Sequence, residues 1–197
     1  MSQKEATRQR GRPAAATRED VVEAGLYRYL RGRRVDVQAI AAEIGVGRAT
    51  IYRWFGSRDN LIGEVVIRAT EPVLAEARAG LRGKGGPGLL DTFDHFNRAL
   101  ADAPALRAFV EQERDAALRL IASGAGIVQP RTVELITGLI TEEVEAGTYE
   151  PPLEPAILGY AIVKLAQAFL FNDTVAGIRG DVDRLREVEA ALLGVPA

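Results

Sequence analysis

The sequence predicts an all-α fold, and three observations support this prediction. Apolar residues recur every three to four positions along almost the whole chain after Thr17, as they do on helices that bury one face. The alternation of apolar and polar residues that marks a strand is nearly absent. The chain has 197 residues, of which 47% are hydrophobic, and this suffices for one or two domains with an apolar core.

The first two helices are predicted from their caps. Thr17 and Asp20 have the spacing of a capping box, so we expect a helix to begin after Thr17 and to end at the basic run RGRR. A second, short helix should begin after Asp36, whose side chain can cap it, and should end at Gly45. The apolar positions expected on its inner face are Val37, Ile40, Ala41 and Ile44.

A third helix is expected over about 48–55, after the turn Gly45-Val46-Gly47. Ile51, Trp54 and Phe55 should face inward. The residues expected on the outward side are Arg48, Thr50, Tyr52 and Arg53. Gly56 and Ser57 should end this helix and cap the next one.

A long helix is expected from Arg58 onward, with a kink near Glu71 because Pro72 cannot donate the helical hydrogen bond. The stretch 83–88, GKGGPG, predicts a flexible break. Further helices are expected over 89–101, 105–123, 130–146, 156–171 and 181–193.

The segment 156–171 is apolar on nearly all sides. Lys164 and Gln167 interrupt it, and it is too short to span a membrane, so we expect a buried helix and no membrane partner.

The charge is divided unevenly along the chain. Residues 1–58 hold twelve Lys and Arg but six Asp and Glu, so this segment carries +6 although the net charge of the chain is −2. A basic segment on an acidic body indicates that the segment meets a polyanion. An ordinary solvated surface with uneven charge is the alternative.

Several classes of site are excluded by composition. The chain has no cysteine, which excludes disulfides, zinc-thiolate sites, iron-sulfur clusters and cysteine nucleophiles, and suits a reducing compartment. His95 is the only histidine, so metal sites with paired imidazoles and most catalytic triads are also excluded, and we expect His95 at the surface. GKGGPG has neither the spacing of a phosphate-binding loop nor a preceding strand. We therefore expect no cofactor, no metal and no enzyme, and a cytoplasmic location, because the charged N-terminus does not resemble a signal peptide.

Two short helices joined by a tight glycine turn have the geometry of a helix-turn-helix. The outward side of 48–53 offers two guanidiniums, a hydroxyl and a phenol, which can bond base edges and phosphates. Ser57 and Arg58 could dock a phosphate at the start of the following helix. An α-hairpin with a solvated outer face is the alternative.

Residues 39–62, AIAAEIGVGRATIYRWFGSRDNLI, resemble the DNA-binding segment of the TetR family of transcriptional regulators. The matching residues are Ala41, Gly45, Val46, Thr50, Tyr52, Phe55, Ser57, Arg58 and Leu61. The resemblance implies contacts with double-stranded operator DNA from Arg48, Ala49, Thr50, Tyr52, Arg53, Ser57 and Arg58. Arg58 stands where the family usually has a phosphate-contacting Lys. Two positions depart from the family pattern, because Gly47 replaces a Ser or Thr cap and Val37 replaces a Thr that often bonds phosphate.

The resemblance also implies the domain organisation. We expect a basic flexible arm at 1–16, a three-helix helix-turn-helix domain at 17–60, and a helical effector-binding and dimerisation domain at 61–197, joined to it by the long helix. The protein would be a homodimeric repressor of a palindromic operator, and a small-molecule effector would release it. The dimer interface residues that we expect are Leu185, Val188 and Leu192. An activator, or a DNA-binding protein without an effector, is the alternative.

The N-terminal arm contains RGRP, which resembles the core of an AT-hook, in which arginines lie in the minor groove. Arg8, Arg10 and Arg12 are expected to add electrostatic affinity for DNA, and a disordered tail is the alternative.

An effector pocket is expected among the middle helices, because aromatic walls with a few amides suit a small amphipathic ligand. The expected lining residues are Phe93, Phe96, Asn97, Phe109, Gln112, Phe169, Asn172 and Asp173. Residues 145–173 resemble the C-terminal region of a TetR subfamily that includes regulators of quorum-signal-degrading operons. This resemblance implies an acyl-homoserine lactone, its ring-opened acid or a fatty-acyl compound as effector.

Overall fold

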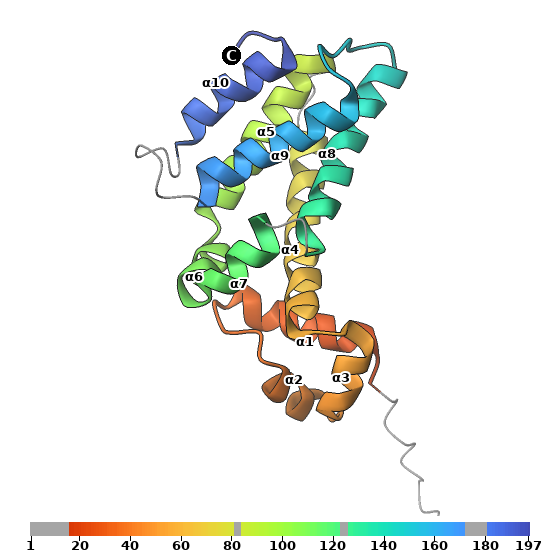
Figure 1. Cartoon of the computed structure of the whole chain (residues 1–197), viewed down its shortest axis with the longest axis vertical. Helices are drawn as coiled ribbons and strands as arrows, with labels where there is room; N and C mark the ends of the chain where they lie inside the picture. Colours follow the sequence, from red (N-terminus) through yellow and green to blue (C-terminus); the bar gives the residue numbers. More distant parts are fainter. Residues whose placement is uncertain (1–15, 81–83, 123–125, 172–180) are drawn as a thin grey trace, which may run out of the picture.

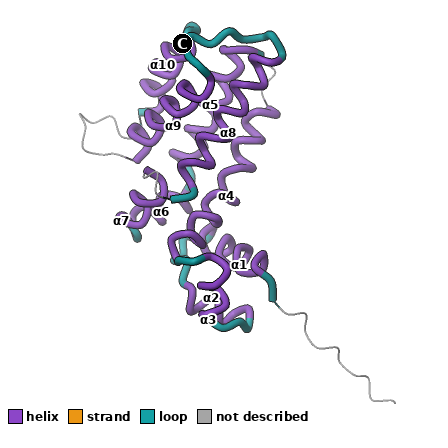
Figure 2. The backbone as a smooth tube through the Cα atoms, turned by 45° about the vertical axis from the view of Figure 1, so that its right-hand side comes forward, coloured by secondary structure: helices purple, strands orange, loops and turns teal. Residues whose placement is uncertain are grey.

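The computed structural model describes residues 16–80, 84–122, 126–171 and 181–197, and all of its regular elements are helical (Figure 1). The all-α prediction is confirmed. In chain order the helices are α1 (Arg18–Leu30), α2 (Val37–Ile44), α3 (Arg48–Phe55), α4 (Arg58–Gly80), α5 (Gly85–Asp102), α6 (Pro104–Gln112), α7 (Arg114–Ala117), the π-helical turn η1 (Leu118–Ala122), α8 (Val128–Glu145), α9 (Pro155–Phe171) and α10 (Val182–Leu193). Helices α1 to α3 form one end of an elongated molecule and α5, α8, α9 and α10 the other, while α4 runs between them (Figures 1 and 2).

The caps of the first helices form as the sequence predicts. Thr17 accepts a hydrogen bond from the amide of Asp20 at 3.2 Å, and the Asp20 carboxylate accepts one from the amide of Thr17 at 2.7 Å. Asp36 caps α2 by accepting from the Ala39 amide at 2.7 Å. Gly45 ends α2 with φ of 74°, a left-handed conformation that glycine adopts without strain. These contacts fix the chain direction on both sides of the turn into α3.

Helix α4 contributes to two separate hydrophobic cores. Leu61, Ile62, Val65 and Val66 lie in a core formed with α1, α2, α3 and α6. Leu74 and Ala77 lie in a second core, formed with α5, α8, α9 and α10. Pro72 lies inside α4, and the helix is continuous on both sides of it.

Two segments differ from the sequence prediction. The expected break at 83–88 is largely helical, because α5 begins at Gly85. A Cβ atom on Gly86 would lie 2.5 Å from Val195 Cγ1, so glycine allows this first turn to pack closely under the C-terminus. The single helix expected over 105–123 is divided into α6, α7 and η1, and the division falls at Glu113 with φ of −138°.

Glu143 links three helices at the end of the molecule remote from α3. Its buried carboxylate accepts hydrogen bonds from Arg78 of α4, from Thr148, and from the amide of Gly85 at 2.6 Å. Burial alone would raise the pKa of Glu143, but the bonds from Thr148, Arg78 and Gly85 outweigh it and lower the pKa to about 2. The ionised carboxylate therefore stabilises the folded state above the usual pKa of glutamate.

Replacing Glu143 with Gln should lower the free energy of unfolding by about 1–3 kcal/mol at pH 7, because three donors lose a charged acceptor. The difference from the unaltered protein should shrink as the pH falls from about 4.5 toward 2, since the carboxyl of the unfolded chain takes up a proton in that range while the folded carboxylate is still ionised, and this proton uptake stabilises the unfolded state. Urea unfolding at pH 7 and at pH 3.5 measures both effects. Glu142→Gln, at the exposed neighbouring position, is the control, and an equal loss in that variant would contradict the assignment.

Candidate nucleic-acid interface and ligand cavity

Helix α3 presents one polar face to solvent at the end of the molecule (Figure 1). Ile51 and Phe55 are buried against α1, α2 and α4 and hold the helix in place. The side chains at the outward positions Arg48, Ala49, Tyr52 and Arg53 are exposed, and Thr50 is partly so. Neither guanidinium on this face has an acidic partner within the described parts of the chain. The face therefore offers cations, a phenol at 45% exposure and a hydroxyl to a ligand.

The start of α3 is open to an anion. Gly47 occupies the N-cap position, and no side chain caps the first turn. The cap is missing because glycine has no side chain, whereas the Ser or Thr common at this position in the family could accept a hydrogen bond. The first-turn amides of Arg48 and Ala49 have no helical acceptor, and such groups attract phosphate.

Arg58 at the start of α4 binds within the protein. Its Nε donates to the carbonyl of Val35 at 3.1 Å, and its two terminal nitrogens each lie 2.7 Å from a carboxylate oxygen of Glu113. The Glu113 bond and charge raise the pKa of Arg58, although its burial acts in the opposite direction. The neighbouring Ser57 caps α4 by accepting from the Asn60 amide at 3.0 Å. A phosphate contact from Arg58 stays a prediction, and it would use the two N–H groups that Glu113 and Val35 leave free.

The arm residues Arg8, Arg10 and Arg12 lie outside the described residues.

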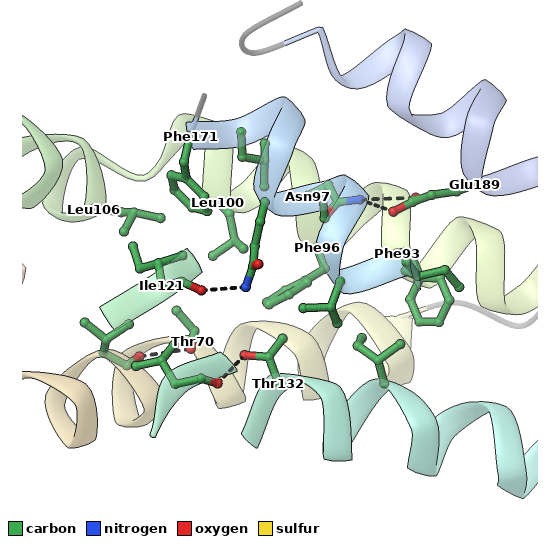
Figure 3. Close-up of a pocket in the computed structure, with 18 residues that line it drawn as sticks. Thr70, Phe93, Phe96, Asn97, Leu100, Leu106, Ile121, Thr132, Phe171 and Glu189 are labelled. Atoms are coloured by element: carbon green, nitrogen blue, oxygen red, sulfur yellow. Dashed lines mark hydrogen bonds between the residues drawn. The ribbon is translucent and has the colours of Figure 1, made fainter. Parts of the chain in front are cut away.

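A cavity of about 70 Å³ opens between α4, α5, α8 and α9 (Figure 3). Its walls are mainly aliphatic and aromatic, and Phe96, Leu100 and Ile162 contribute to them. The polar side chains in the lining are Thr70, Asn97, Thr132, Gln167 and Glu189. Such a cavity can hold the apolar chain of a small amphipathic molecule and bond its polar head.

The structure brings together part of the set predicted to bind an effector. Phe93, Phe96 and Asn97 line the cavity. Phe169 is buried but is not part of the cavity lining, and Asn172 and Asp173 fall outside the described residues.

Phe109 and Gln112 were expected in the pocket and lie elsewhere. The ring of Phe109 meets Tyr29 of α1 edge to face, with centroids 6.2 Å apart. Gln112 Nε2 donates to the carbonyl of Gly32 at 2.9 Å. The break at Glu113 separates α6 from the helical turns that follow. Helix α6 packs against α1 and contributes Leu106 to the cavity, while Phe109 and Gln112 lie away from it.

Four polar residues of the cavity were not in the predicted set, namely Thr70, Thr132, Gln167 and Glu189. Gln167 was visible as an interruption of the apolar segment 156–171, but it was not connected with a ligand. Glu189 gave no signal, because an acid among the charges of α10 resembles a solvated residue. In the structure Glu189 is fully buried, and Asn97 Nδ2 lies 3.0 and 3.2 Å from its two oxygens. Burial raises the pKa of Glu189 to about 8.

Both α9 and α10 have apolar side chains at the surface, and the most exposed ones are on α9. Ile157 and Tyr160 are 55% and 51% exposed, while Val188 and Leu192 of α10 are partly exposed. Leu185 was expected at a dimer interface, but its side chain is fully buried in its own subunit and has no surface left for a partner. Of the three α10 residues expected at the interface, Leu185 therefore belongs to the core, while Val188 and Leu192 reach the surface.

Within the described residues, no group of acidic or histidine side chains could hold a metal ion, and His95 is exposed. In the same residues, no helix is long and apolar enough to cross a membrane.

Two family profiles match the chain. Residues 30–65 match the bacterial regulatory proteins of the tetR family, and residues 84–194 match the tetracyclin repressor-like C-terminal domain. Among curated proteins there is no match.

Solved structures show the same fold. The chain is similar to the R. erythropolis transcriptional repressor QsdR from the TetR family, with 28% identity and a TM-score of 0.84 over 91% of this chain and 95% of that chain. It is also similar to the TetR family repressor AlkX from Dietzia sp., implicated in biodegradation of n-alkanes, with 24% identity and a TM-score of 0.62 over 91% and 96%. The C-terminal profile alone spans more than half of the chain, and the matched helix-turn-helix agrees with it. The chain therefore belongs to the TetR family of transcriptional regulators.

Proposed function

We propose that the protein is a homodimeric repressor that binds a palindromic operator through α3 and leaves it when a small amphipathic effector enters the cavity. The observation that carries this proposal is the face of α3 at one end of the molecule, where the side chains of Arg48, Tyr52 and Arg53 are exposed to solvent. A helix held in this way can enter a major groove, where arginine and tyrosine bond bases and phosphates. In this proposal, residues 17–60 form the DNA-binding domain and residues 61–197 form the effector-binding and dimerisation domain.

The dimer interface in this proposal is formed by α9 and α10. Ile157 and Tyr160 are large apolar side chains at more than half exposure on one helix, and Val188 and Leu192 lie on the adjoining one. A two-fold axis through this surface would bury them and pair two α3 helices with two half-sites of DNA.

The cavity supports an effector with an apolar chain and a small polar head. The resemblance of residues 145–173 suggests an acyl-homoserine lactone, its ring-opened acid or a fatty-acyl compound. We infer that occupancy is transmitted through η1, since Gln167 in the lining donates to the Ile121 carbonyl at 2.5 Å. From η1 the chain leads back through α7 to Glu113, which binds Arg58 at the base of α4.

No catalytic role or cofactor is part of this proposal, and binding to chromosomal DNA places the protein in the cytoplasm. An activator, or a regulator without an effector, is the competing function.

A mobility-shift assay tests the proposal. The purified protein is mixed with DNA from upstream of its own gene, and a panel of acyl-homoserine lactones and fatty acids is then added. We expect a shift that exceeds the shift of random DNA, and its relief by one class of compound. A shift that no compound relieves would favour the regulator without an effector, and no specific shift would contradict an operator at this site.

Tyr52→Ala should weaken operator binding by at least about tenfold, because the substitution removes the phenol that meets DNA and leaves the core of the domain untouched. Fluorescence anisotropy with labelled operator DNA measures the affinity. Tyr27→Ala is the matched control, since Tyr27 is 49% exposed on α1 and packs against Arg31. If both variants bind as the unaltered protein does, Tyr52 is not part of the DNA surface.

Ile157→Asp should shift the protein from dimer to monomer, because a charge would be desolvated at the centre of the proposed interface. Light scattering after size-exclusion chromatography gives the mass. Leu30→Asp, at 60% exposure on α1, is the control and should leave the dimer intact. A dimer that persists in Ile157→Asp at micromolar concentration would place the interface elsewhere.

A further inference from the structure

Each amide or hydroxyl side chain of the cavity donates a hydrogen bond inside the protein (Figure 3). Thr70 and Thr132 donate their hydroxyl hydrogens to the carbonyls of Val66 and Val128, each at 2.9 Å. Asn97 Nδ2 is directed at the carboxyl group of Glu189. Gln167 Nε2 donates to the Ile121 carbonyl. These groups still offer a ligand their oxygen lone pairs, together with the second N–H of Gln167 and the O–H of Glu189, whose raised pKa keeps the carboxyl protonated at pH 7.

Gln167 Oε1 is the acceptor that lacks a partner. Gln167 lines the cavity and is 9% exposed, and its Oε1 atom is shielded from solvent without a hydrogen bond. A buried carbonyl oxygen without a donor is unfavourable, because it has lost its bonds to water and gained none in return. A ligand that brings an N–H or O–H group to this atom would remove that cost.

The cavity is poorly suited to an anion. Among the described residues of its lining there is no Lys, Arg or His, and Glu189 contributes a carboxyl group. A carboxylate placed here would leave water for an apolar space without a cation to compensate it. An uncharged head incurs no such penalty.

We propose, on the basis of the effector site proposed above, that the cavity selects an uncharged amphiphile whose head donates an N–H or O–H hydrogen bond to Gln167 Oε1. Within the range of effectors considered above, this favours an intact acyl-homoserine lactone, which is uncharged and has an amide N–H. Free fatty acids lack the N–H and are anions at pH 7, and ring-opened acids keep the N–H but carry a carboxylate. The specificity resides in Gln167, while the aliphatic and aromatic walls supply affinity for the chain.

Three probes with the same ten-carbon acyl chain separate these possibilities. Decanamide is uncharged and has N–H donors, methyl decanoate is uncharged and has none, and decanoate is an anion. Isothermal titration of the full chain at pH 7 should show decanamide binding about tenfold more tightly than the other two, as one hydrogen bond to a buried acceptor predicts. Equal binding of decanamide and methyl decanoate, or tighter binding of decanoate, would overturn the proposal. A fourth compound, the cation decylammonium, tests whether Glu189 binds the head. If it binds more tightly than decanamide, the proposal is overturned, because the carboxyl of Glu189 would then be the partner of the head.

The variant Gln167→Leu should remove the preference for decanamide over methyl decanoate and leave the affinity for methyl decanoate within about threefold. Gln129→Leu is the matched control, because Gln129 is also a buried glutamine with an unpaired Oε1 but does not line the cavity. Its preference should be unchanged, and loss of the preference in Gln129→Leu alone would overturn the assignment to Gln167. The comparison of probes in the unaltered protein stands even if Gln167→Leu does not fold.

The same titrations distinguish this inference from the proposed function. Binding of methyl decanoate with no preference for decanamide rejects the role of Gln167 and retains the cavity as an effector site. Absence of binding by all three uncharged and anionic probes rejects both. Release of operator DNA by a bound probe is measured separately, so a ligand that binds without releasing DNA contradicts the proposed repressor mechanism only.

Discussion

The organisation of the molecule depends on α4 being shared by two hydrophobic cores. Leu61 and Val65 are buried with the helices that surround α3, and Leu74 and Ala77 are buried among α5 and α8 to α10. A helix of 23 residues extends about 35 Å, so the two cores are connected by a stiff element and not by a linker. Since protein interiors are close-packed, rearrangement around the cavity can be accommodated only by moving α4 or by sliding past it. The position of α3 is thereby coupled to the packing of the C-terminal helices.

A polar junction holds the break between α6 and α7 to the helices around α3. Glu113 is buried there and binds Arg58, whose Nε also holds the carbonyl of Val35 in the segment before α2. Gln112 bonds the carbonyl of Gly32 nearby. Removing one partner of a buried ion pair leaves an uncompensated charge, so this junction tolerates change poorly. It explains why the one long helix expected over 105–123 is divided, since the chain turns where Glu113 meets the DNA-binding end.

The cavity combines an apolar volume with polar side chains that hydrogen-bond to other helices of the protein. Asn97 and Glu189 join α5 to α10, and Gln167 joins α9 to η1. These bonds fix the walls while leaving acceptor oxygens toward the space. In the proposed mechanism, the hydrogen bond that holds η1 to α9 belongs to the same side chain that would select the head of the ligand.

Local features could be predicted from the amino-acid sequence alone. The capping residues Thr17 and Asp36, the turn at Gly45 and the outward residues of α3 follow from short-range geometry and helical periodicity, and the structure has them where the sequence predicts. Periodicity could not decide which side of an amphipathic helix meets its own core and which meets a partner, so Leu185 was misplaced at an interface. Nor could it reveal the burial of Glu189, the partner of Arg58 or the position of Phe109 against Tyr29, because each depends on residues distant in the chain. These features became evident from the packed helices, since the pairing of a buried charge is fixed by which helices come together and not by the sequence around it.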